Sequence, residues 1–158
     1  MKNWLMKTEP NEFSIDDLKR VKKEMWDGVR NYQVRNMMRD EMRVGDLVLI
    51  YHSGAGDKTG IAGVAKISKE AFPDPTQFDQ FSAHPDLKSD PLNPRWFCVQ
   101  VEFVEKFVDV ITLRDLKFDP KMKDSRLVKR GNRLSIIPIT EKEFEYIKSL
   151  AKLKILQR

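Results

Sequence analysis

The segment "MWDGVRNYQVRN", residues 25–36, sets one large aromatic side chain beside a turn signal and a run of polar residues. Trp26 precedes Asp27-Gly28, a pair typical of turns. An indole at such a place could simply plug the mouth of a barrel, and the residue type alone favours this structural role. Proteins that hold a single unstacked base need the same combination, an aromatic face for stacking and polar groups at the base edge. The segment alone leaves both interpretations open.

A lysine, a hydroxyl and a carboxylate stand together in Lys7, Thr8 and Glu9, where the first strand is expected to end. On an extended chain Lys7 and Glu9 share one face, where they could act as general acid and base. A second acid or base does not accompany them in the sequence. We therefore favour an ion pair or a ligand-binding role and assign no catalytic residue.

The residues that usually hold metals or act as nucleophiles do not form a pattern. His52 and His84 are the only histidines, and Cys98 is the only cysteine, so we expect no metal site and no cofactor. His52 and Ser53 are neighbours on a strand and would point to opposite faces. The alternating neighbours of Cys98 predict a buried thiol. Residues 54–60, "GAGDKTG", precede a strand rather than a helix and predict a hairpin loop instead of a phosphate loop.

Basic residues exceed acidic ones by 29 to 24, and the pI is near 9.3. This mild excess favours polyanionic partners without requiring them. Arg35 belongs to an arginine stripe at helical spacing, which is most simply a solvated face and alternatively a phosphate contact. Arg130 and Arg133 surround an expected Gly131-Asn132 turn, and exposed arginine on a turn suits phosphate oxygens.

Capping patterns and hydrophobic periodicity predict the elements that position these residues. Ser14 with Asp17 forms a capping pattern. The same pattern, a threonine followed three positions later by an acidic residue, begins again at Thr112 and at Thr140. Alternation from 96 to 104 is typical of a strand with one covered face. We expect helices at 15–25, 32–42, 113–117 and 141–151. We expect strands at 4–7, 47–53, 61–67, 96–104 and 135–139, the last at a sheet edge because of Pro138.

These elements show no regular βαβ alternation, which predicts an α+β fold with a mainly antiparallel, strongly curved sheet or small barrel of five or six strands and flanking helices. The 158 residues suit one domain, 1–158. Residues 71–95 carry five of the eight prolines and predict a binding loop or lid, with Phe72, Phe78 and Phe81 pinning it to the body.

Apolar runs are too short for the ~18 to 20 residues that cross a bilayer. A signal peptide is not apparent at the N-terminus. We therefore expect a cytoplasmic protein that neither crosses nor binds a membrane, and most simply a monomer.

Six blocks of the sequence resemble the EVE domain of the PUA-like superfamily. The resemblance runs from about Asn3 to Leu150. It implies a pseudo-barrel with flanking helices and kinship with the YTH domain, which holds a methylated adenine of RNA in an aromatic cage. The blocks are, in order, "NWLMKTEPNEFSIDDL", "WDGVRNYQVRN", "VGDLVLIYHS", "GIAGVAKI", "FPDPTQFD" and "LVKRGNRLSIIPIT".

The resemblance also implies roles for particular residues. Trp26 is similar to the cage tryptophan and would be the stacking face, with Lys7, Thr8 and Glu9 at its rim. The resemblance and the residue types together predict wall residues at Asn31, Tyr51 and Ser53, and phosphate contacts at Arg35, Arg130 and Arg133.

A non-catalytic reader of a modified nucleobase, in DNA or RNA, is therefore the leading expectation. Two alternatives remain open at this point. One is a small hydrolase of modified nucleosides that reacts through residues 7–9, and the other is a general RNA-associated module that binds through its basic faces.

Overall fold

The computed structural model describes residues 1–131 and 133–157. Within these residues six strands form one sheet, accompanied by four α-helices and three short 3-10 helices. The strands are β1 (Asn3–Thr8), β2 (Lys23–Met25), β3 (Leu47–His52), β4 (Gly60–Pro73), β5 (Phe97–Thr112) and β6 (Ile136–Ile139). The α-helices are α1 (Ile15–Val21), α2 (Tyr32–Asp40), α3 (Leu113–Phe118) and α4 (Glu141–Leu156). The 3-10 helices are η1 (Gly56–Lys58), η2 (Pro75–Phe78) and η3 (Pro120–Met122).

The strands are arranged in the order β2-β5-β4-β3-β1-β6. β1 pairs in parallel with β3, and the other four pairings are antiparallel. The predicted α+β class and mainly antiparallel sheet are therefore confirmed. The sheet is not closed into a barrel, which corrects that part of the expectation. Closure would need β2 to pair with β6, but these strands have three and four residues, and Pro138 lacks an amide hydrogen.

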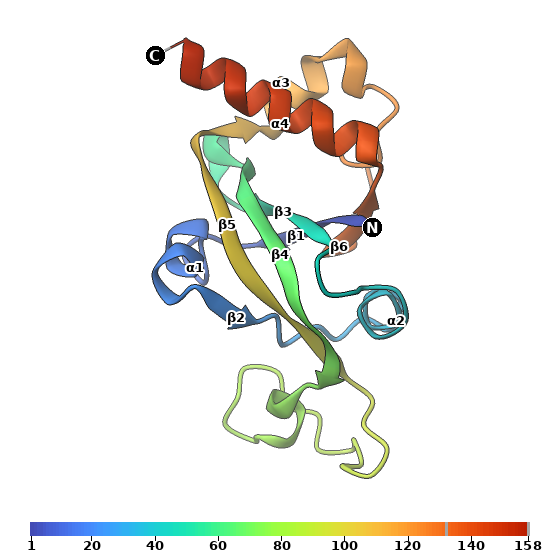
Figure 1. The fold of residues 1–158 in the computed structure, drawn as a ribbon. Helices are drawn as coiled ribbons and strands as arrows, with labels where there is room; N and C mark the ends of the chain where they lie inside the picture. The colour runs from blue at the N-terminus through green and yellow to red at the C-terminus, as the bar shows by residue number, and fades with distance from the viewer. Residues whose placement is uncertain (132, 158) are drawn as a thin grey trace.

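Strands β4 and β5 extend well beyond their predicted limits. Their pairing shifts register at several places between Ile61 and Phe72, and such bulges bend a strand and increase its twist. Bulges also interrupt the apolar alternation, so the sequence pattern fades after Val104 although β5 continues to Thr112. Figure 1 shows these two strands running the length of the molecule, with α3 and α4 at one end and the loop of residues 74–95 at the other.

A core cluster lies on each face of the sheet. Because neighbouring strand residues point to opposite faces, Trp4 and Met6 of β1 join one cluster and Leu5 joins the other. Helices α1 and α2 cover the first face, for example with Met38, and α4 covers the second, for example with Phe144. Cys98 has no exposed surface, and burial raises the pKa of its thiol to about 12, so the predicted buried thiol is confirmed.

The first helix begins as predicted but ends earlier. Ser14 Oγ accepts from the Asp17 N–H at 3.1 Å, and the Ser14 N–H donates to the Asp17 carboxylate at 2.9 Å, which completes a capping box. Lys22 adopts a φ of +74°, and its N–H donates to the Leu18 carbonyl. The expected helical residues 23–25 instead form β2, which pairs with β5. Long-range strand pairing has overridden the local helical pattern.

The other helices follow their capping signals. Thr112 and Thr140 cap α3 and α4 as predicted, and α4 continues five residues past its expected end at 151, to Leu156. Over the described residues, the helices are all too short or too polar to span a bilayer.

Candidate functional site

A pocket of about 990 Å³ opens where the end of β1, residues 24–31 and the loop residues Ala83 and His84 meet. Its volume lies at the upper end of the ~300 to 1,000 Å³ typical of ligand pockets. The two strand ends at its rim are tied together, because the Ser53 N–H donates to the Thr8 carbonyl at 2.9 Å. Seven of the predicted site residues line it: Lys7, Thr8, Glu9, Trp26, Asn31, Ser53 and Arg133.

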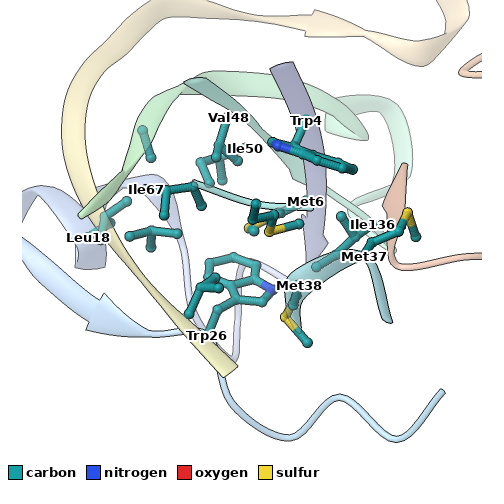
Figure 2. Packing of buried hydrophobic residues seen from close by; sticks show 14 of the residues in the cluster. Trp4, Met6, Leu18, Trp26, Met37, Met38, Val48, Ile50, Ile67 and Ile136 are labelled. Atoms are coloured by element: carbon teal, nitrogen blue, oxygen red, sulfur yellow. The ribbon is translucent and has the colours of Figure 1, made fainter. Parts of the chain in front are cut away.

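Trp26 is both a core residue and a pocket wall. Its side chain is 9% exposed, and in Figure 2 the indole lies within the cluster that Met6 and Met38 also form. The Phe13 ring meets it edge-on, with centroids 6.4 Å apart, and the backbone N–H of Trp26 donates to the Val99 carbonyl at 2.8 Å. Trp26 also lines the pocket. These contacts hold the ring in a fixed position, which suits a stacking surface.

The rim residues Lys7 and Thr8 already have contacts within the protein. The Thr8 hydroxyl donates to the Phe13 carbonyl at 2.9 Å, so this hydroxyl is already engaged in a local hydrogen bond. The Lys7 ammonium lies 5.7 Å from the centroid of the Tyr51 ring, and burial lowers the pKa of Lys7. This arrangement does not favour a hydrolase that reacts through the Thr8 hydroxyl.

The three predicted wall residues have different environments. Asn31 caps α2 by accepting from the Val34 N–H at 3.0 Å, which leaves its amide nitrogen as the donor for a guest. Ser53 lines the pocket. Tyr51 does not reach it: the side chain is 6% exposed and packs in the core cluster on the other face of the sheet. β3 ends at His52, so strand alternation no longer relates Ser53 to Tyr51.

The three arginines predicted to contact phosphate also lie in different environments. Arg130 and Arg133 are exposed and line a neighbouring depression of about 430 Å³, and Arg133 borders the main pocket as well. The expected turn beside them has Gly131 at a φ of +82°, and Asn132 lies outside the described residues. Arg35 instead lies 4.7 Å from the Tyr32 ring centroid and donates to the Arg95 carbonyl at 2.9 Å. Its guanidinium therefore supports the structure.

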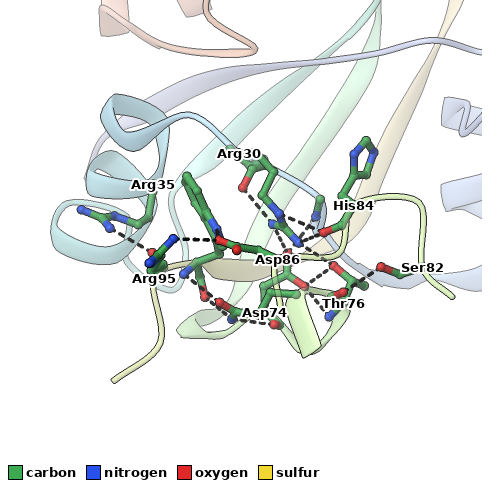
Figure 3. A network of polar contacts seen from close by, with 12 residues as sticks. Arg30, Arg35, Asp74, Thr76, Ser82, His84, Asp86 and Arg95 are labelled. Carbon is green, nitrogen blue, oxygen red and sulfur yellow. Dashed lines mark hydrogen bonds and ion pairs between the residues drawn. The ribbon is translucent and has the colours of Figure 1, made fainter. Parts of the chain in front are cut away.

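An ion pair that the sequence did not indicate holds the loop against the pocket (Figure 3). Arg30 Nη1 lies 3.1 Å from the Asp74 carboxylate, whose side chain has no exposed surface. Arg30 Nε and Nη2 donate to the His84 carbonyl at 3.0 and 2.6 Å. The same Asp74 oxygen accepts from the Gly28 N–H at 2.8 Å. Both sides of the pocket mouth are thus tied to one buried carboxylate.

Electrostatics at the mouth follow from this ion pair. Burial by itself would raise the pKa of Asp74, but hydrogen bonds from Thr76, Gly28 and Arg30 together hold it below its ordinary value. The neighbouring Asp27, which lines the pocket, has its pKa raised by burial and by the charge of Asp74. The mouth therefore combines one carboxylate whose pKa is lowered, Asp74, with a second whose pKa is raised, Asp27.

Polar side chains, rather than the predicted Phe78 and Phe81, pin the long loop, while the third predicted residue, Phe72, is half-buried and belongs to β4, where it pairs with Cys98. Phe78 is 36% exposed and Phe81 is 88% exposed, whereas Gln77 is fully buried. The Gln77 amide nitrogen donates to the carbonyls of Asp74 and Trp96 at 2.7 and 2.8 Å. Its oxygen accepts from the Ser89 hydroxyl at 2.7 Å. A buried amide that satisfies several backbone groups at once has no distinctive sequence pattern, which explains why it was missed.

An aromatic stack joins the same loop to α2. The rings of Tyr32 and Trp96 lie 4.8 Å apart with an interplanar angle of 22°. Arg30 and Arg35 cover the two ends of this stack, 5.5 Å from the Trp96 ring and 4.7 Å from the Tyr32 ring. The Trp96 indole N–H donates to Asp86 at 2.8 Å. The stack braces the side of the pocket to which Arg30 and Asn31 belong.

Groups of three or more metal-ligating side chains are not found among residues 1–131 and 133–157. The site is thus a pocket with one indole wall, several polar groups on its rim and exposed arginines beside it. Together with an open, mainly antiparallel sheet covered by helices on both faces, this defines a small α+β protein of the kind that the PUA-like resemblance implies.

The chain belongs to the EVE domain family, whose model matches residues 2–150. Human thymocyte nuclear protein 1 is 42% identical over 167 residues, which cover 94% of this chain and 73% of the relative. A crystal structure of a Pseudomonas syringae protein is 44% identical, with a TM-score of 0.89 over 94% of this chain and 99% of that chain. The crystal structure of human THYN1 in complex with DNA containing 5-methylcytosine is 40% identical, with a TM-score of 0.87 over 96% of this chain and 98% of that chain.

Proposed function

We propose that this protein is a non-catalytic nucleic-acid-binding module that reads a modified base, with 5-methylcytosine in DNA as the first candidate. The observation that carries the proposal is the fixed Trp26 indole at the wall of a pocket whose rim is polar. The human relative crystallised with DNA containing 5-methylcytosine supports the choice of the first base to test.

In the proposed complex the base stacks on the exposed part of Trp26, a contact that contributes about 1 to 3 kcal/mol. Stacking alone discriminates poorly between bases, because every base has a π-face. The Asn31 amide nitrogen, the Ser53 hydroxyl and the Glu9 carboxylate supply donors and acceptors for the base edge. A carboxylate suits the exocyclic amine of cytosine in particular.

Arg130 and Arg133 then act outside the pocket, on the phosphates that flank the bound base. Both side chains are exposed and lie beside the pocket mouth. Phosphate contacts of this kind position a nucleic acid without reading its sequence. Replacing both with alanine should therefore weaken binding to modified and unmodified oligonucleotides equally.

The decisive test compares wild type, Trp26→Phe and Trp26→Ala by fluorescence anisotropy with oligonucleotides that carry cytosine or 5-methylcytosine. We expect Trp26→Ala to lose about tenfold or more in affinity for the methylated probe, and Trp26→Phe to lose less. Trp26 also belongs to the core, so thermal unfolding must confirm that each variant is folded at the assay temperature. A folded Trp26→Ala variant with wild-type affinity would refute the pocket assignment.

Two rim variants test the pocket without disturbing the core. Glu9 is exposed and Ser53 is half-buried, so Glu9→Gln and Ser53→Ala should leave the thermal stability within about 0.5 kcal/mol of wild type. Each should reduce the preference for 5-methylcytosine over thymine at the same position, because thymine carries the same C5 methyl group but has an O4 acceptor in place of the exocyclic amine. Matched RNA probes in the same series distinguish a DNA reader from an RNA reader.

A further inference from the structure

An exposed aromatic side chain projects from a rigid turn next to the pocket mouth. Phe81 is 88% exposed. Its backbone N–H donates to the Asp79 carboxylate at 2.9 Å, and the Ser82 N–H donates to the Asp79 carbonyl at 3.0 Å. This is an Asx turn, and it presents the Phe81 ring to solvent.

The turn is anchored to the body of the protein. The Ser82 hydroxyl donates to the Thr76 carbonyl at 2.7 Å, and the Thr76 hydroxyl donates to the buried Asp74 at 2.6 Å. Two residues beyond Ser82, the His84 carbonyl is held by Arg30 (Figure 3). Phe81 is thus flanked by fixed positions on both sides, and its ring projects from an ordered support.

The turn is also continuous with the pocket. Ala83 and His84, the second and third residues after Phe81, line the pocket mouth. A single exposed apolar side chain on a protein surface needs no special explanation. Phe81 differs because its turn is held by a buried carboxylate network that also forms the mouth.

A duplex creates a gap when one of its bases enters a protein pocket. Extruding a base costs unstacking and unpairing energy, and the neighbouring bases lose a stacking partner. DNA-binding proteins frequently offset such losses by inserting an apolar side chain, phenylalanine among them, between base steps. An aromatic ring beside the pocket mouth meets this requirement.

We propose that Phe81 inserts into duplex DNA at the position vacated by the base that occupies the Trp26 pocket. This inference rests on the proposed function, because the gap exists only if a base is bound there. It predicts a specific separation of roles: Phe81 contributes to binding a base that must leave a duplex, whereas Trp26 contributes to binding the base in any context.

The test uses Phe81→Ala with Phe118→Ala as the matched control. Phe118 is 79% exposed and ends α3, at the opposite end of the molecule from the loop of residues 74–95 (Figure 1). Each variant is titrated with a matched duplex containing one 5-methylcytosine, with the corresponding single strand, and with a duplex in which the 5-methylcytosine is mispaired.

We expect Phe81→Ala to weaken binding to the matched duplex by roughly 5- to 150-fold, the range that corresponds to one base–aromatic stack. Binding to the single strand should change less than about twofold, because no gap has to be filled. Wild type and Phe81→Ala should both bind the mispaired duplex more tightly than the matched duplex, since a mismatched base costs less to extrude. Phe81→Leu should retain part of the duplex affinity, and Phe118→Ala should behave as wild type with all probes.

Two results would overturn the inference while leaving the proposed function intact. One is wild-type affinity of Phe81→Ala for the matched duplex. The other is an equal loss with duplex and single strand, which would indicate that Phe81 only supports the loop. A wild-type protein that binds none of the modified oligonucleotides would instead refute the proposed function, and the insertion with it, before any variant is compared.

Discussion

Replacing Arg30 with alanine should both destabilise the protein and loosen the pocket mouth. The Arg30 side chain is 20% exposed and Asp74 has no exposed surface, so the pair is largely shielded from water. Removing one partner of a buried ion pair typically costs about 3 to 5 kcal/mol. The cost is largely that of leaving the other charge buried without its counterion.

The remaining contacts of Asp74 bring the expected value to or below the lower end of that range. After the change Asp74 still accepts from the Gly28 N–H, the Thr76 N–H and the Thr76 hydroxyl, at 2.8, 2.8 and 2.6 Å. The His84 carbonyl, in contrast, loses both guanidinium donors. We expect a loss of about 2 to 3 kcal/mol in the free energy of unfolding. Arg30→Lys should recover only part of this loss, because the lysine ammonium cannot reproduce the planar, forked set of donors of the guanidinium.

Urea denaturation measures the effect, with Arg39→Ala as the matched control. Arg39 forms an exposed ion pair with the adjacent Asp40, and such pairs contribute about 0 to 1 kcal/mol. A double-mutant cycle between Arg30→Ala and Asp74→Asn isolates the coupling between the two charges. If Arg30→Ala costs no more than Arg39→Ala, the buried carboxylate does not depend on its counterion and the account of the mouth is wrong.

Two further predictions concern Gly28, which lines the pocket, and His52, which accepts a hydrogen bond from the start of α1. Gly28 has a φ of +79°, and a Cβ there would lie 2.8 Å from His84 Cδ2. Gly28→Ala should therefore cost about 1 to 2 kcal/mol in the free energy of unfolding and weaken binding of 5-methylcytosine probes. Unchanged stability and affinity would show that the His84 side chain moves aside without cost. His52 accepts from the Ile15 N–H at 3.1 Å, and burial lowers the pKa of His52, so the unfolded chain binds this proton at a higher pH than the folded chain. The free energy of unfolding should therefore fall as the pH drops below about 6.5 and onward through the lower folded pKa, and urea titrations of His52→Gln should lack that contribution; an identical pH slope in the variant would contradict the assignment.

The sequence located most elements because their signals are local. A capping residue and its acidic partner lie three positions apart, and the helix starts after Ser14, Thr112 and Thr140 follow directly from that spacing. Apolar runs of strand length likewise located β3 and β4, and alternation located the first part of β5. The strand ends were missed where bulges break the alternation, and β2 was missed because only its pairing with β5 makes it a strand.

The sequence by itself determined the fold class, the helix starts and the composition of the rim, since residues 7–9 and Trp26 are each near an element end in the chain. Tertiary structure alone decided what surrounds them. Asp74 meets Arg30 and Gly28 across separations of 44 and 46 residues, and Tyr51 faces the opposite core. Such contacts depend on how strands and loops pack in three dimensions. A pattern of residue types along the chain indicates only the relations between residues that are close in sequence.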